Sequence, residues 1–221
     1  MLSLIAASAL GAFTTTDMPG FDRIASTGSV DVEVTVDPSA EQPFVVRLDG
    51  DPEAIEKVEL SVSGDTLEVR TGSGWTRGRV RLLTTLPVLK AVELTGSGDL
   101  EVEGLAGTPL DVRVFGSGDV RLGGTVGDLD VKTAGSGDVK IAQVKARRVV
   151  LAAPGSGDLT IAGATERLRI DLMGSGDVDA RRLTATEVDA RLMGSGDVAL
   201  CAKGELRQRV MGSGDIVSRC D

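Results

Sequence analysis

The chain has 221 residues, a formal net charge of −9, a hydrophobic fraction of 41% and an aromatic fraction of only 2%. Its acidic balance excludes a nucleic acid as partner, because phosphate binding requires a basic surface. With no His and two Cys in the sequence, Ser–His and Cys–His nucleophiles and CxxC-type zinc or redox sites are excluded, and no cofactor is expected. The 29 glycines and scarce aromatics predict a thin, regular interior of aliphatic side chains joined by tight turns.

Residues 1–16 are expected to be a leader or a truncated signal peptide. The first twelve residues are apolar and small, and Ala7-Ser8-Ala9 resembles a signal-peptidase site, although a basic start is missing. The segment is too short to span a bilayer as a helix, so no transmembrane span is expected. Together with the cysteines, it predicts export to the periplasm or the cell surface.

Residues 17–90 are expected to form less regular coils that cap the N-terminal side of a solenoid. Apolar and polar residues mostly alternate over residues 30–36, 44–48 and 58–62, as they do in strands with one buried face. Ser63-Gly64-Asp65 is a degenerate copy of the turn found later in the chain, and Trp75 is expected to cover an open coil end.

Residues 91–221 contain a Gly-Ser-Gly-Asp (GSGD) motif seven times, at intervals of 20, 19, 20, 19, 20 and 18 residues. Such a period is the mark of a repeat architecture. The motif aspartates are Asp99, Asp119, Asp138, Asp158, Asp177, Asp197 and Asp215.

On both sides of each motif, apolar residues alternate with polar ones. Leu100 and Val102 follow Asp99 and flank Glu101, for example, and the same pattern precedes the next motif. This period-2 alternation predicts two strands per repeat, stacked coil on coil into an all-β, parallel β-helix. Antiparallel hairpins are the weaker alternative, because they would not demand identical residues at every turn. Leu122, Ile141 and Ile161 should form one inward column, with Arg121, Lys140 and Thr160 outside.

The GSGD motif is expected to be architectural. Its glycines, such as Gly137 and Gly157, would permit positive φ at a sharp corner, and its Ser and Asp would bind turn N–H groups. The alternative is calcium shared along the edge formed by the seven aspartates, which would lie about 4.8 Å apart. The motif lacks the nine-residue spacing of calcium-binding RTX repeats, so a metal site is not favoured.

Cys201 and Cys220 follow consecutive motif aspartates by four and five residues, which places them in adjacent coils. We expect them to form a disulfide that closes the C-terminal coil, where Gln208 and Ser218 occupy positions that are aliphatic in most other repeats. Two free thiols, as in a cytosolic protein, are the alternative.

The GSGD array resembles the bacterial family called putative autotransporter adhesin, head GIN domain. The resemblance extends to the GFDRI segment at residues 20–24, VDVEV at residues 30–34, Thr85-Leu86-Pro87 and LTGSGD at residues 94–99. It implies a right-handed β-helix similar in shape to pectate lyases but lacking their catalytic residues, with an adhesion role. It carries over no site residues.

The function expected is therefore that of a non-catalytic cell-envelope protein that presents a β-helix surface for binding, adhesion or scaffolding. Its partners would be a cell-surface protein, a glycan or a second copy of the chain. A carbohydrate-acting enzyme of the polysaccharide-lyase type and a calcium-stabilised repeat protein are the alternatives. Two further features are noted: the pairs Arg147-Arg148 and Arg181-Arg182 could mark a basic spot, and Met173, Met193 and Met211 share one slot before the motif.

Overall fold

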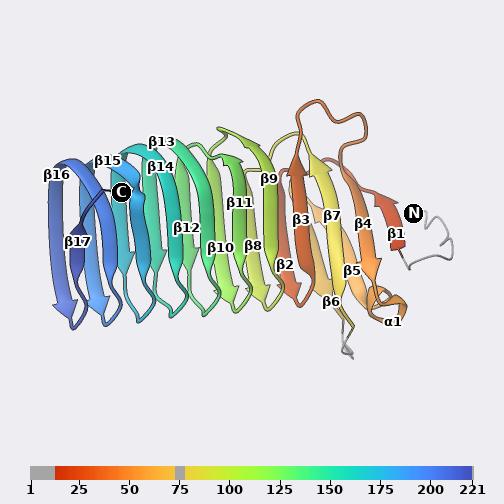
Figure 1. Ribbon diagram of the computed structural model, residues 1–221. Coiled ribbons are helices and arrows are strands. Elements are labelled where there is room, and N and C mark those ends of the chain that lie inside the picture. Colours follow the sequence, from red (N-terminus) through yellow and green to blue (C-terminus); the bar gives the residue numbers. More distant parts are fainter. Residues whose placement is uncertain (1–12, 73–77, 221) are drawn as a thin grey trace.

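The computed structural model describes residues 13–72 and 78–220. Within these ranges the chain is almost entirely strand, with one short helix, and the strands form a single elongated stack (Figure 1). The elements are β1 (Phe13–Asp17), β2 (Arg23–Gly28), β3 (Asp31–Val36), β4 (Val45–Gly50), α1 (Pro52–Ile55), β5 (Val58–Ser63), β6 (Thr66–Thr71), β7 (Val80–Leu86), β8 (Ala91–Gly96), β9 (Leu100–Ala106), β10 (Leu110–Gly116), β11 (Val120–Thr125), β12 (Leu129–Thr133), β13 (Val139–Ala153), β14 (Leu159–Leu172), β15 (Val178–Gly194), β16 (Val198–Gly212) and β17 (Ile216–Ser218).

From β8 onward the chain is a parallel β-solenoid, as the repeat predicts. Strands that precede a GSGD motif stack on one face, and strands that follow it stack on the other. In β13 to β16 one long strand runs from one face through the bend to the other. All pairings among these repeats are parallel, which excludes the antiparallel hairpin alternative for this part of the chain.

Coils of unequal length stay aligned because irregularities in the bends absorb the extra residues. The register between β13 and β14 shifts between Ile141 and Val144 and is regular on either side. A larger shift, between Ala180 and Thr184, accommodates the shorter coil that follows in β16. The bends can therefore vary in length, whereas the strands beside each motif keep a constant register.

The core consists of aliphatic columns that run along the solenoid axis. Leu122 pairs with Ile141 and Ile141 with Ile161, and these three side chains are at most 2% exposed. Arg121, Lys140 and Thr160 form the neighbouring outward column. Burying such a side chain stabilises the fold by about 1.5–3 kcal/mol, so the regular column compensates for the scarcity of aromatic residues.

The N-terminal region differs from a simple run of coils. The coil formed by β2 and β3 lies between the coil of β6 and β7 and the coil of β8 and β9, so the chain enters the stack in its interior. Strands β1, β4 and β5 then pair antiparallel and cover the N-terminal end (Figure 1). Residues 17–90, expected to form less regular coils, therefore contain both parallel coil strands and antiparallel strands that cover the end.

Two sequence expectations fall at the edges of the described ranges. Residues 13–16, expected to belong to a leader, form most of β1 and pair with β4. Residues 1–12 and Trp75 lie outside the described residues. A leader over the first twelve residues stays a prediction.

The motif glycines are required by close stacking rather than by positive φ. Gly137 and Gly157 are absent from the positive-φ residues, so the conformational reason expected for them is wrong. A Cβ placed on Gly137 would overlap the carbonyl oxygen of Gly118 one coil earlier, and a Cβ on Gly157 would overlap that of Gly137. Positive φ does occur at the first motif glycine in some repeats, such as Gly96, at 135°.

A glycine substitution tests this explanation. Gly157→Ala should destabilise the protein by about 3 kcal/mol, because the new methyl group meets backbone that cannot move without breaking the stack. In Gly123→Ala the Cβ would lie 3.4 Å from the carbonyl oxygen of Val102, an ordinary contact, so the loss should stay within about 0.5 kcal/mol. Urea melts measure both. Equal losses would show that stacking does not select the motif glycine.

Candidate binding surface

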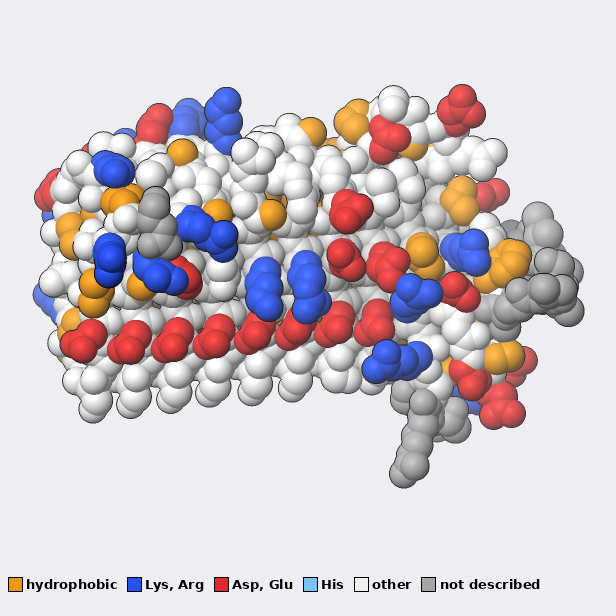
Figure 2. All heavy atoms as spheres, viewed as in Figure 1, with side chains coloured by type: hydrophobic (Ala, Val, Ile, Leu, Met, Phe, Trp, Pro, Cys, Tyr) orange, Lys and Arg blue, Asp and Glu red, His pale blue; other side chains and the backbone are white. Residues whose placement is uncertain are grey.

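The motif aspartates form a continuous hydrogen-bonded row, which we call the aspartate ladder. In each case Oδ1 of one aspartate accepts a hydrogen bond from the backbone N–H of the aspartate in the next coil, at 2.8–3.1 Å. Figure 2 shows this row of acidic side chains along one edge of the solenoid. The ladder comprises Asp31, Asp99, Asp119, Asp138, Asp158, Asp177, Asp197 and Asp215.

Asp31 is a ladder member that the motif search missed. It follows Gly28-Ser29-Val30, in which Val replaces the second glycine of the motif. The N–H of Asp99 nevertheless donates to Oδ1 of Asp31, and the Ser97 hydroxyl lies 3.1 Å from that of Ser29. The ladder therefore begins in the inserted N-terminal coil and joins it to the regular repeats.

Hydrogen bonding gives the ladder a structural role that needs no metal. Each bonded carboxylate satisfies an N–H that the strand ladders leave over, and a charged acceptor makes such a bond stronger than a neutral one. Asp119 also lies 3.3 Å from the guanidinium of Arg121. Over residues 13–72 and 78–220, no group of three or more Cys, Asp or Glu side chains is arranged to hold a metal ion.

A surface groove runs across β13 to β16, on the face formed by strands that precede a motif. We call it the arginine groove. It has a volume of about 320 Å³, and its charged lining consists of Arg148, Arg167, Arg169, Glu187, Asp189, Glu205 and Arg207. Its apolar lining residues are Val149, Val150, Leu168 and Val188.

The register of the parallel strands brings these charges together. Arg148 pairs with Arg167, which pairs with Glu187 in the next coil. Arg169, Asp189 and Arg207 form the neighbouring column. Each of these residues occupies an outward position of its strand, and in β13 to β15 the alternate residues are buried, so the paired backbones fix the spacing between charges.

The arginines of the groove are ion-paired but still accessible. Arg167 lies 3.4 Å from Glu187, Arg169 lies 2.7 Å from Asp171 and Arg207 lies 2.8 Å from Glu205, with arginine side chains 48–75% exposed. The contact with Asp171 raises the pKa of Arg169. Exposed pairs of this kind contribute at most about 1 kcal/mol each, so a ligand can replace one partner at little cost.

The two arginine pairs noted in the sequence do not form one basic spot. Arg148 lines the groove, and the backbone N–H groups of Arg147 and Arg148 donate to Oδ1 of Asp128 at 2.8 and 3.1 Å. These two bonds lower the pKa of Asp128. Arg181 is ion-paired with Asp179 at 2.7 Å, which lowers the pKa of that carboxyl group.

Arg182 lies on the opposite face. There it lines a shallow groove of about 440 Å³ together with Glu101, Arg121 and Lys140. Across the described part of the chain, the arginine groove is thus the place where several arginines from consecutive coils converge.

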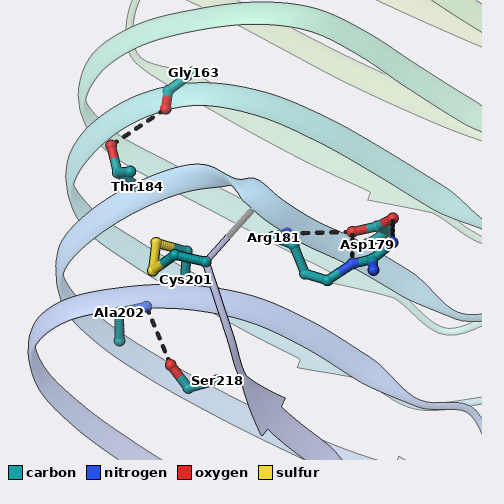
Figure 3. The surroundings of a disulfide bond; sticks show 8 residues. Gly163, Asp179, Arg181, Thr184, Cys201, Ala202 and Ser218 are labelled. Atoms are coloured by element: carbon teal, nitrogen blue, oxygen red, sulfur yellow. Dashed lines mark hydrogen bonds and ion pairs between the residues drawn. A yellow bond between two sulfur atoms is a disulfide. The ribbon is translucent and has the colours of Figure 1, made fainter.

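Cys201 and Cys220 form a disulfide, as expected from their spacing (Figure 3). The Cys201 side chain is fully buried in the coil interior. Strand β17 pairs with the first part of β16, the Arg219 N–H donates to the Leu200 carbonyl at 2.7 Å, and the Ala202 N–H donates to the Ser218 hydroxyl at 3.3 Å. The disulfide therefore fixes the terminal segment over one half of the last coil.

The calcium alternative can be tested directly against the ladder. Because Oδ1 of each aspartate up to Asp197 already accepts an N–H, a chelator should leave the melting temperature unchanged, and millimolar calcium should not raise it. Differential scanning calorimetry with and without the ion measures this. A large, saturable increase with calcium would instead establish the edge as a metal site.

Comparisons with known proteins agree with the fold. The family model described as "Putative auto-transporter adhesin, head GIN domain" matches residues 20–221, which is most of the chain. A comparison with curated protein sequences finds no match.

Several solved structures share the architecture. One, described as a putative lipid-binding protein from Parabacteroides distasonis, is 17% identical, with a TM-score of 0.75, covering 95% of this chain and 97% of that one. A putative adhesin from the same species is 18% identical, with a TM-score of 0.73 and coverage of 93% and 96%. A putative adhesin from Parabacteroides merdae is 17% identical, also with a TM-score of 0.73, covering 93% and 95%. Identities this low establish a common fold, while the family match establishes membership: the chain belongs to the family described as "Putative auto-transporter adhesin, head GIN domain".

Proposed function

We propose that the chain is a non-catalytic protein of the cell envelope that binds a cell-surface glycan or protein through the arginine groove. The observation that carries this proposal is the register that sets Arg148, Arg167, Arg169 and Arg207 on three of four consecutive coils, with Glu187 and Asp189 on the remaining coil, β15. Their spacing follows the strand separation of about 4.8 Å. An extended ligand lying along the axis can therefore contact each coil in turn.

The chemistry of the groove favours a ligand with carboxylate or sulfate groups. Guanidinium groups form paired, charge-assisted hydrogen bonds with such anions, and the interleaved carboxylates of Glu187, Asp189 and Glu205 can accept from hydroxyl or amine groups. The groove contains no aromatic side chain, so stacking against sugar rings does not contribute. Recognition then depends on charge and hydrogen bonding.

The enzyme alternative finds less support. A polysaccharide lyase needs a cleft built from long loops that hold carboxylates and bases around the substrate. Here the groove lies on the strands themselves, and the bends between faces are short enough for β13 to β16 each to continue through them. The absence of His from the whole sequence also removes the commonest neutral-pH base.

Several observations support export to the envelope. The disulfide requires an oxidising compartment. The family and two of the structural neighbours are described as putative adhesins, and the first residues resemble the end of a secretory signal. Among the described residues no helix is both long and apolar enough to cross a membrane.

Cell fractionation followed by binding of the purified protein to whole cells and to a glycan panel tests the proposal. Arg148→Glu with Arg167→Glu should weaken binding at least about tenfold, since one lost charge-assisted hydrogen bond costs about 1.5–3 kcal/mol. Arg113→Glu is the matched control, because Arg113 is a similarly exposed, ion-paired arginine of the same face outside the groove. It should bind as the unmodified protein does.

Three outcomes would contradict the proposal: a cytosolic protein with free thiols, equal binding by the groove variant and its control, or release of new reducing ends from a glycan of the panel. The last would favour the enzyme instead.

A further inference from the structure

The C-terminal end of the solenoid exposes an unpaired strand edge. The second half of β16, Glu205–Gly212, pairs with β15 on one side. On its other side β16 pairs with β17 over Val198 to Leu200 only. Within residues 13–72 and 78–220, the N–H and C=O groups on the outer side of Glu205–Gly212 therefore have no strand to pair with, and such an edge is a template for another chain.

This edge also leaves the hydrophobic core open. Leu206, Gln208 and Val210 are the inward residues of the strand, and they pair with Val188, Ala190 and Leu192 one coil earlier. Those three are at most 3% exposed, whereas Val210 is 42% exposed, Gln208 is exposed and Leu206 is half-buried. The core columns of the solenoid thus end in contact with solvent here.

Exposed apolar side chains are concentrated near the same end. Over the described part of the chain, every exposed large hydrophobic residue lies in the last coils: Met173, Met193, Val210, Met211 and Val217. At the opposite end β1 and β5 also have a side that no described strand pairs with, but their apolar residues Phe13, Val58, Leu60 and Val62 are half-buried. Covering the C-terminal edge would therefore bury more exposed apolar surface than covering the opposite end.

We propose that this edge pairs with the same strand of a second copy, giving a two-fold symmetric dimer joined end to end. In an antiparallel pair, directly opposite residues lie on the same face of the sheet. With the two-fold axis at Gln208, Leu206 of each copy lies opposite Val210 of the other, and Gln208 lies opposite its own counterpart. The inward pattern Leu-Gln-Val is thus self-complementary: apolar residues meet apolar ones, and the two amides can hydrogen-bond to each other.

The outward residues oppose this register in one respect: Arg209 of each copy lies directly opposite Arg207 of the other, and like charges so placed are destabilising. Arg209 has no ion-pair partner among the described residues, whereas Arg207 is held 2.8 Å from Glu205 of its own strand. In the dimer, Glu205 of one copy lies diagonally across from Arg209 of the other, about 7–8 Å away along the backbone, which long side chains can bridge. The diagonal carboxylate offsets part of this repulsion.

Pairing through Gln208 also selects this register over its neighbours. Moving the axis to Arg207 or Arg209 would place Gln208 opposite Leu206 or Val210, leaving the amide without a polar partner. A buried polar residue of this kind fixes register at some cost in stability.

Sedimentation of the full chain over a wide range of protein concentration tests the proposal. The unmodified protein should form a dimer and no larger species. Val210→Asp should give a monomer, whereas Val217→Asp, the same change at a residue that is 54% exposed but outside the edge strand, should leave the dimer intact. Gln208→Cys should form an intermolecular disulfide under mild oxidation, and Val217→Cys should not.

A charge reversal guards against misfolding of the Val210 variant. Arg209→Glu should strengthen the dimer, because the new carboxylate lies directly opposite Arg207 of the other copy, and adding Arg207→Glu should remove that gain. A monomer at all concentrations, an open-ended series of larger species, or equal effects at Val210 and Val217 would overturn the proposal. Since the groove test changes Arg148 and Arg167, failure of ligand binding and failure of dimerisation are distinguishable.

Discussion

The backbone of each GSGD turn lies directly on the turn of the coil before it, and the remainder of the fold follows from this contact. The motif glycines leave no Cβ between successive backbones, and the Asp carboxylate accepts the N–H of the next Asp. Neither interaction tolerates a displaced turn. Any residue larger than glycine would separate the coils, and a shifted register would leave a charged oxygen and an N–H unpaired on the same edge. The aspartate ladder therefore holds successive coils together in the same way as the backbone hydrogen bonds between strands, but its acceptors are side-chain carboxylates.

Because the edge is fixed, the inward and outward positions of the strands differ in how much sequence change they tolerate. Inward positions must be aliphatic and of similar size, because each contacts the same position in the coils before and after it. Outward positions are free to vary, and in the last coils they place arginines and carboxylates together in the same columns. Binding chemistry can thus change without a change in fold, which agrees with the low sequence identity of the structural neighbours.

Sequence analysis predicts the repeats well and the exceptions poorly, for physical reasons. Period-2 alternation beside a strict motif determines the parallel pairing, the Leu122–Ile141–Ile161 column and the disulfide. It does not reveal that the coil of β2 and β3 is inserted between later coils, because that depends on pairings between segments far apart in the chain. The arginine groove was also missed: its columns align only after the irregular bends have been counted correctly. The place of Asp31 in the ladder could have been predicted from the sequence, since Gly28-Ser29-Val30-Asp31 differs from the motif by a single residue.

Amide hydrogen exchange at the ladder tests the central claim most directly. The Asp158 N–H lies on an exposed edge and donates to Oδ1 of Asp138 at 3.0 Å. It should exchange as slowly as the amides of the neighbouring strands, because it opens only when the coils separate. In Asp138→Ala that amide should exchange much faster, while the core amides of Ile141 and Ile161 remain protected. Fast exchange of Asp158 in the unmodified protein, or no change in the variant, would show that the carboxylates do not hold the turns together.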